Sequence, residues 1–280
     1  MNEANYVNPL SEPQAPTPDD PPWNILVALG VWLLSVVLIF LIPTLFVGPY
    51  AISRGIDIGN KEALTNFLFS DQTAIILQLA PVILAHALTL LVAWFVVTRS
   101  NTFSFRRTLG WTMNGFKVWH AFAITLAFYG IFIALVNIFG KVDNEFSKMI
   151  SNSRYAVYLV AFFATFTAPL TEEVIYRGLL YSAFQRPLGK VLAIVFVTIL
   201  FTLVHVPQYS MDSQPDIATL VTLLLVSLTL TLIRAQTGSL LPCIVLHTIF
   251  NGIQSGLLLA EPYLRFLEPA IEPTTTSFIK

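Results

Sequence analysis

ILVALGVWLLSVVLIFLIPTLFV, residues 25–47, is a predominantly apolar run without a charged residue. A helix crosses a bilayer with about 20 apolar residues, each adding about 1.5 Å along its axis. This run is therefore long enough to span a membrane. Comparable apolar segments lie further along the chain, at residues 74–97, 119–139, 155–170, 188–206, 217–233 and 240–259.

The length and uniformity of these segments decide the fold class. The strands of a membrane barrel alternate in polarity over about 9–11 residues, whereas these segments are longer and apolar throughout. We therefore expect an all-α fold, a polytopic transmembrane helical bundle of about seven to eight spans. The helical pattern of the fourth segment continues to about residue 184. An eighth span would come from residues 51–70 or from a different division of 150–184.

We expect one helical domain over residues 25–260, with its chemically informative part at 155–260. Residues 1–24 are polar and end in a stretch rich in Pro and Asp, which predicts a disordered leader. They contain no Lys or Arg, so the pattern of a signal peptide is not expected there. Residues 261–280 are expected to form a short C-terminal tail.

The composition places the protein in a membrane. Of its 280 residues, 55% are hydrophobic and 11% are charged, and the mean hydropathy is +0.72. Soluble domains carry about 25% charged residues, so this is an integral membrane protein whose immediate partner is the lipid bilayer. A net charge of -1 gives no field that would attract nucleic acid. A single cysteine, Cys243, excludes an internal disulfide and a Cys-rich metal site.

The charges between the segments support two opposite orientations in the membrane. Residues 98–118 carry four basic residues and no acid, whereas 207–216 carry two acids and no base. The positive-inside rule then puts the first loop and the N-terminus in the cytoplasm. Residues 141–154, with three basic residues, favour the reverse.

Three short polar motifs interrupt the later apolar segments. Residues 172–177 read Glu-Glu-Val-Ile-Tyr-Arg, residues 201–205 read Phe-Thr-Leu-Val-His and residues 247–251 read His-Thr-Ile-Phe-Asn. An ionisable group at bilayer depth is costly and marks a functional site by default. Together the motifs supply carboxylates, imidazoles, a guanidinium and a carboxamide, which are the groups needed to activate a water and to stabilise an oxyanion.

The first motif contains two carboxylates with different expected surroundings. Glu173 and Arg177 are four residues apart on a helix and can form an ion pair, while Glu172 projects about 100° away. One acid is then neutralised and the other stays free to act as a general base. The alternative is a purely structural Glu-Arg clamp on one turn of helix.

The histidine motifs each place two residues on one helix face. His205 shares a face with Phe201, and imidazole can exchange a proton near neutral pH or bind a metal. His247 and Asn251 present paired donors suited to a developing oxyanion. Each set also has a simpler interpretation as interhelical hydrogen bonding. For the second, that interpretation is favoured by the small residues at 252 and 256, which let another helix approach closely.

In this order and in these membrane segments, the motifs resemble the CAAX protease and bacteriocin-processing (CPBP) family of intramembrane proteases, also called the type II CAAX prenyl endopeptidase or Abi family. The resemblance covers about residues 155–260 and matches the family pattern at every motif position. It implies an intramembrane endopeptidase.

The resemblance also implies roles for six residues. It makes Glu172 the base that activates the hydrolytic water, with Glu173 and Arg177 in support, and His205 a group that orients or activates that water. The remaining two motif residues, His247 and Asn251, are implied to form the oxyanion pocket.

The motif residues allow two mechanisms, one that uses a bound metal and one that does not. Catalytic zinc usually has three protein ligands and one open position, and Glu172, His205 and His247 could supply three. That choice would leave only Glu173 as a base, although Glu173 is best placed to pair with Arg177. We therefore favour a metal-independent mechanism over a divalent metal such as zinc.

The expected substrate is a hydrophobic peptide or a lipidated protein, because only such a chain partitions into a membrane-embedded site. The resemblance implies either CAAX-type C-terminal processing or bacteriocin maturation and immunity. The compact size and the lack of long soluble segments between the spans predict a multi-pass protein of a prokaryotic plasma membrane. Two other functions fit the composition: a non-catalytic self-immunity or scaffold protein, and a small membrane transporter whose polar groups line an ion path.

Overall fold

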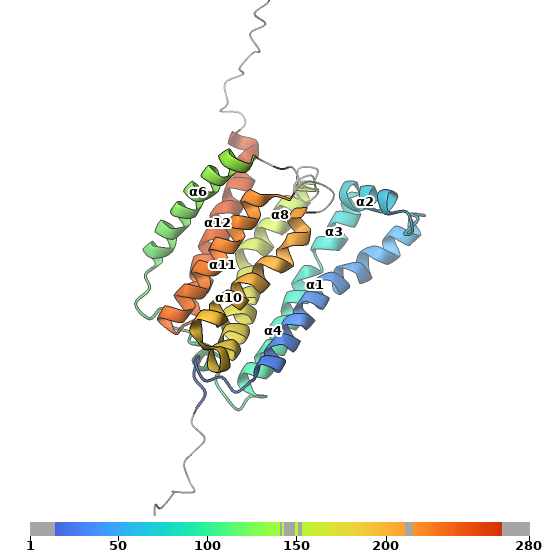
Figure 1. The fold of residues 1–280 in the computed structure, drawn as a ribbon. Helices are drawn as coiled ribbons and strands as arrows, with labels where there is room; N and C mark the ends of the chain where they lie inside the picture. The colour runs from blue at the N-terminus through green and yellow to red at the C-terminus, as the bar shows by residue number, and fades with distance from the viewer. Residues whose placement is uncertain (1–14, 141, 143–148, 151–152, 211–214, 265–280) are drawn as a thin grey trace, which may run out of the picture.

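The computed structural model describes residues 15–140, 142, 149–150, 153–210 and 215–264. Within them the regular elements are helices, without a β-strand, and they lie side by side in one bundle (Figure 1). The predicted all-α polytopic bundle is therefore confirmed. The helices are α1 (Ile25–Ser53), α2 (Lys61–Ser70), α3 (Gln72–Leu79), α4 (Val82–Thr98), α5 (Phe105–Leu109), α6 (Val118–Phe139), α8 (Arg154–Phe162), α9 (Ala168–Glu173), α10 (Tyr181–Ser210), α11 (Ile217–Thr237) and α12 (Leu241–Leu264), with π-helical segments η1 (Phe163–Thr167) and η2 (Val174–Leu180).

Among the described residues, six helical stretches are long and apolar enough to cross a membrane. One of them, Arg154–Ser210, has 57 residues. Straight, it would be about 85 Å long, far beyond a hydrocarbon core of about 30 Å. It bends at Gly189, whose φ of 76° and ψ of 166° are not helical.

The two arms of this stretch fold back on each other. The rings of Phe184 and Phe196 lie 6.0 Å apart, and those of Tyr176 and Phe201 lie 5.0 Å apart. Contacts between residues at similar distances before and after Gly189 are those of an antiparallel hairpin. The stretch therefore crosses the bundle twice, and the described helices make seven passes, within the predicted range.

Local sequence fixes where several helices begin. Six of the described helices start after an Asn, Ser or Asp whose side chain accepts a hydrogen bond from the backbone N–H three residues later, which satisfies an otherwise unpaired donor. These caps are Asn24, Asn60, Asp71, Ser104, Ser153 and Asp216. Pro81, which lacks an N–H, separates α3 from α4.

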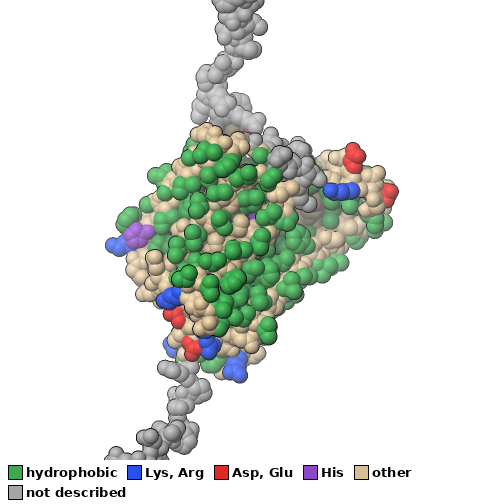
Figure 2. Space-filling model, in the orientation of Figure 1, with side chains coloured by type: hydrophobic (Ala, Val, Ile, Leu, Met, Phe, Trp, Pro, Cys, Tyr) green, Lys and Arg blue, Asp and Glu red, His purple; other side chains and the backbone are tan. Residues whose placement is uncertain are grey.

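The most deeply buried part of the bundle surrounds η2. Every residue from Glu173 to Gln185 is buried, and α1, α4 and α10 pack around this segment. By contrast, large apolar side chains cover the outer surface of the helices, and most charges gather near the two ends (Figure 2). This inverted surface suits a bundle whose solvent is lipid.

The N-terminal leader differs from its expected disorder at residues 15–24, which pack against the end of the bundle where α1 begins (Figure 1). Trp23 is only 5% exposed, and its Nε1 donates to the Leu179 carbonyl at 3.1 Å. The buried Arg234 of α11 donates from Nη2 to the Pro18 carbonyl at 2.9 Å. A large aromatic ring and an acceptor for a buried cation give this segment its order. Residues 1–14 and 265–280 lie outside the described part.

We expect Trp23→Ala to lower the free energy of unfolding by about 3–5 kcal/mol, because it removes a buried ring and leaves a cavity. Thermal unfolding of the purified protein in detergent measures this loss. Trp119→Ala is the matched control, since Trp119 is 61% exposed on α6 and its truncation leaves no buried cavity. Equal melting temperatures for the two variants would contradict a packing role for residues 15–24.

Candidate active site

The helix that carries the first motif is not a regular α-helix. Two π-helical segments, η1 and η2, flank the short helix α9, so the helical pattern predicted to continue through the motif is present but contains two π-turns. At the end of η1, the Ala168 N–H bonds to the Phe163 carbonyl, five residues back. Each π-turn inserts one extra residue and so rotates the next part of the helix by about 100°, and such turns occur frequently at functional sites. Both glutamates of the motif lie between these two rotations.

Arg177 forms the predicted ion pair with Glu173. Its Nη1 lies 2.9 Å from Glu173 Oε1, and both side chains are fully buried. Arg177 also donates from Nε to Thr231 Oγ1 at 3.2 Å and from Nη2 to Ser227, to the carbonyl at 2.9 Å and to the hydroxyl at 2.8 Å. The centroid of the Phe201 ring lies 4.9 Å from the guanidinium carbon. A cation buried this deeply needs such a complete set of partners.

His247 joins the same cluster from α12. Its Nδ1 lies 2.7 Å from Glu173 Oε1, so the ring donates this proton to the carboxylate. Its Nε2 lies 3.8 Å from Glu172 Oε2. The imidazole is 5% exposed and stands between the two carboxylates. The first and third motifs, distant in sequence, thus meet at one point.

Glu172 differs from Glu173 in its surroundings. Its side chain is 25% exposed, whereas that of Glu173 is fully buried. Glu172 is therefore the carboxylate of the pair that is accessible from outside the cluster.

His205 lies on the opposite arm of the hairpin. Its Nδ1 donates to the carbonyl of Phe201 at 2.7 Å, so in the neutral ring the Nε2 lone pair remains free. The ring of Phe201 lies 4.7 Å from that of His205 and 6.2 Å from that of His247. The ring of Phe201 therefore lies next to both imidazoles.

Asn251, one turn beyond His247, donates from Nδ2 to the carbonyl of Ala164 in η1 at 2.8 Å. Ser255, a further turn on, donates to the Ala161 carbonyl at 3.3 Å. The third motif thus also performs the interhelical bonding that was its alternative interpretation. Of the two small residues after it, Gly252 approaches another helix: a Cβ there would lie 3.4 Å from Thr165, whereas one at Gly256 would meet nothing within 4 Å.

Several residues that support the cluster lie outside the three motifs. Ser227 and Thr231 lie in an apolar segment with no spacing that links them to Arg177. Trp32 of α1 donates from Nε1 to the hydroxyl of Tyr176 at 3.1 Å. His86, on α4, bonds through Nδ1 to Thr167 Oγ1 at 2.8 Å. Helices α1 and α4, which carry no motif, therefore help to hold the motif-bearing helix.

A comparison with protein families agrees with this geometry. Residues 154–253 match the family model described as type II CAAX prenyl endopeptidase Rce1-like. This part of the chain is therefore similar to the Rce1-like domain of that family. The match confirms the resemblance drawn from the three motifs, and all six candidate residues lie within it. No curated protein and no solved structure matches the chain.

The candidate zinc ligands of the Rce1-like region do not fit a metal centre. His205 and His247 both direct Nδ1 at an oxygen, an orientation common in metal-binding histidines. Among the residues that the structure describes, however, no three His, Cys, Asp or Glu side chains come together as a metal site. The third candidate ligand, Glu172, lies 3.8 Å from His247 without completing such a set.

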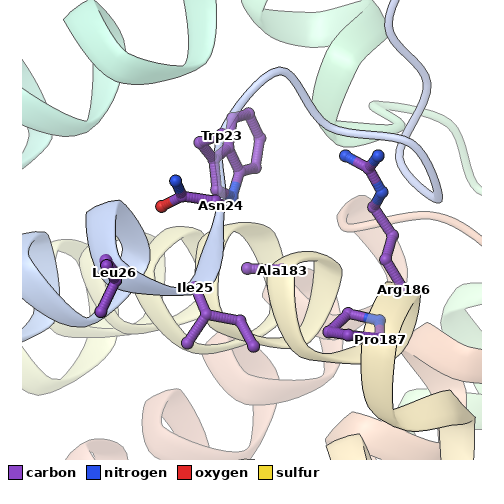
Figure 3. Close-up of a pocket in the computed structure, with 7 residues that line it drawn as sticks. All are labelled: Trp23, Asn24, Ile25, Leu26, Ala183, Arg186 and Pro187. Atoms are coloured by element: carbon purple, nitrogen blue, oxygen red, sulfur yellow. The ribbon is translucent and has the colours of Figure 1, made fainter.

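One cavity lies away from the motifs of the Rce1-like region. It has a volume of about 610 Å³ and opens beside the start of α1 (Figure 3). Its lining consists of Trp23, Asn24, Ile25, Leu26, Ala183, Arg186 and Pro187. None of these belongs to the candidate active site, so the cavity is a feature of the packed N-terminal segment.

Arg177→Met should lower the free energy of unfolding by about 3–5 kcal/mol, because it leaves Glu173 as a buried charge without its cation. Thermal unfolding in detergent, compared with Arg106→Met at an exposed position on α5, measures this loss. Adding Glu173→Gln to Arg177→Met should restore part of the stability. Simple additivity of the two losses would argue against a coupled pair.

Proposed function

We propose that this protein is an intramembrane endopeptidase that hydrolyses a peptide bond of a hydrophobic or lipid-anchored substrate. The single observation that carries the proposal is the convergence of two glutamates and His247 at one buried point inside a membrane bundle. The match to the Rce1-like family supports a protease.

Glu172 is the general base in this mechanism. It is the partly exposed carboxylate, whereas Glu173 is committed to Arg177 and His247. Glu172 takes a proton from a water as the water oxygen attacks the substrate carbonyl, and the proton then passes to the leaving amine. His205 orients the water, because its free Nε2 lone pair can accept the second water proton.

His247 stabilises the oxyanion that forms on the carbonyl oxygen. Since Nδ1 already donates to Glu173, a donor at Nε2 requires the doubly protonated ring. The carboxylates of Glu172 and Glu173 on either side of the ring suit that cation. The resemblance also assigns Asn251 to this pocket, with part of its amide committed to Ala164.

The site's position defines the substrate class. A catalyst inside seven apolar passes reaches peptides that enter the bilayer by their own hydrophobicity or by a lipid anchor. The proposed substrates are therefore C-terminal CAAX-type tails or hydrophobic bacteriocin precursors, processed in a prokaryotic plasma membrane. Purified protein incubated with prenylated and plain hydrophobic peptides tests this, with new peptide termini read by mass spectrometry.

Glu172→Gln should lower peptide hydrolysis by about 10²–10⁴-fold, because glutamine keeps the shape of the side chain and cannot accept a proton. The rate of appearance of new termini measures the loss, and the melting temperature should stay near that of the wild type. Glu62→Gln, at an exposed position on α2, is the matched control and should keep full activity. A fully active Glu172→Gln protein would refute the proposed base. If the wild type cleaves no peptide but transports a solute or ion in liposomes, the protein is a transporter.

Hydrolysis should persist after dialysis against a zinc chelator, because the proposed water is activated by Glu172 and His205 without a metal. The same peptide assay, run before and after dialysis and after adding zinc back, measures this. Loss of activity that zinc restores would replace this mechanism with a metal-dependent one.

A further inference from the structure

The carbonyl of Ala164 in η1 has lost its usual backbone donors. Along a helix, the N–H four or five residues later satisfies such a carbonyl, depending on whether the turn is α or π. The N–H four residues on, that of Ala168, bonds instead to Phe163. The residue five positions on is Pro169, which has no N–H.

The side chain of Asn251 supplies the missing donor. Its Nδ2 lies 2.8 Å from the Ala164 oxygen. Of the two polar atoms in an asparagine side chain, the nitrogen is the one that can donate to a carbonyl. An unsatisfied carbonyl inside the bundle would be costly, because neither lipid nor apolar side chains can replace the bond. The interaction therefore compensates for Pro169 from a different helix.

The π-turn that needs this compensation directs the catalytic glutamates. It immediately precedes α9, which ends in Glu172 and Glu173, so its extra residue sets the direction in which both side chains project. A second contact stabilises the same turn: Thr165 Oγ1 donates to Ser255 Oγ at 3.0 Å. Asn251 and Ser255 follow His247 at intervals of four residues, so all three lie on one face of α12.

We propose that Asn251 is a positioning residue, whose amide replaces the N–H absent at Pro169 and so holds the π-turn that aims Glu172 toward His247. The inference rests on the proposed function, because it takes Glu172 as the catalytic base. It gives Asn251 a hydrogen bond to the backbone of the helix that carries this base, in place of a direct contact with the oxyanion. Helix α12 then positions both His247, which it carries, and the two glutamates, whose direction it fixes through Asn251.

A double-mutant cycle tests the assignment with Asn251→Ala, Pro169→Ala and the combined variant. Pro169→Ala returns an N–H at the position that faces the Ala164 carbonyl. We expect Asn251→Ala to lower kcat by about 10²-fold through misplacement of the base, with little change in KM. Pro169→Ala should stay active, and the combined variant should recover most of the lost kcat. An oxyanion donor cannot be rescued in this way, so a combined variant no better than Asn251→Ala overturns the proposal.

The pH dependence of kcat gives a second readout. Loss of an oxyanion donor lowers the rate by the same factor at every pH, whereas displacement of Glu172 also moves the acid limb of the profile. A pH profile of Asn251→Ala that keeps the shape of the wild-type profile overturns the assignment. This readout does not need an active Pro169→Ala variant.

The melting temperatures of the four proteins separate this inference from the proposed function. If the wild type hydrolyses no peptide, the proposed function fails, yet the cycle can still be read from stability. Rescue of the Asn251→Ala melting temperature by Pro169→Ala then supports the backbone compensation, and strict additivity refutes it.

Discussion

The buried ion pair between Glu173 and Arg177 is the interaction on which the rest of the structure depends. A charge pair without solvent is stable only if further hydrogen bonds hold its members in place. Arg177 has these bonds through Ser227 and Thr231 on α11. Glu173 is held at Oε1 by His247 on α12, while its buried Oε2 has no hydrogen-bond partner among the described residues. One pair thus fixes three helices against each other, and it leaves Glu172 as the accessible acid.

Much of this arrangement could be predicted from spacing alone. Apolar runs predicted the passes, and the four-residue interval predicted the Glu173–Arg177 pair, because both depend on contacts within one helix. The meeting of Glu173 with His247 could be inferred only from chemistry, since no local rule joins residues so distant in sequence. The partners of Arg177 were missed for the same reason: Ser227 and Thr231 are ordinary residues in an apolar helix.

The π-turns could not be predicted for a different reason. Pro169 signals that a backbone bond is missing, but the chain can respond with a kink, a break or an inserted residue. The response depends on which donor a neighbouring helix offers to the free carbonyl. Here Asn251 of α12 offers an amide at the Ala164 carbonyl, so the helix continues with an extra residue and without a break. The local sequence leaves a carbonyl without its backbone donor, and the contact with another helix decides which backbone conformation results.

The same logic of compensation explains why the N-terminal segment is ordered. Arg234 lies on α11 beyond the residues that hold Arg177, and it donates to Ser182 of α10 at 3.0 Å. The contacts between these helices are therefore reciprocal. Arg177 of η2 donates to residues of α11, and Arg234 of α11 donates to a residue of α10. Arg177 finds enough acceptors within the bundle, whereas Arg234 also takes the Pro18 carbonyl and has Asp19 at 3.7 Å. The segment before α1 thus supplies an acceptor and a carboxylate to a buried arginine of the helix that also holds Arg177.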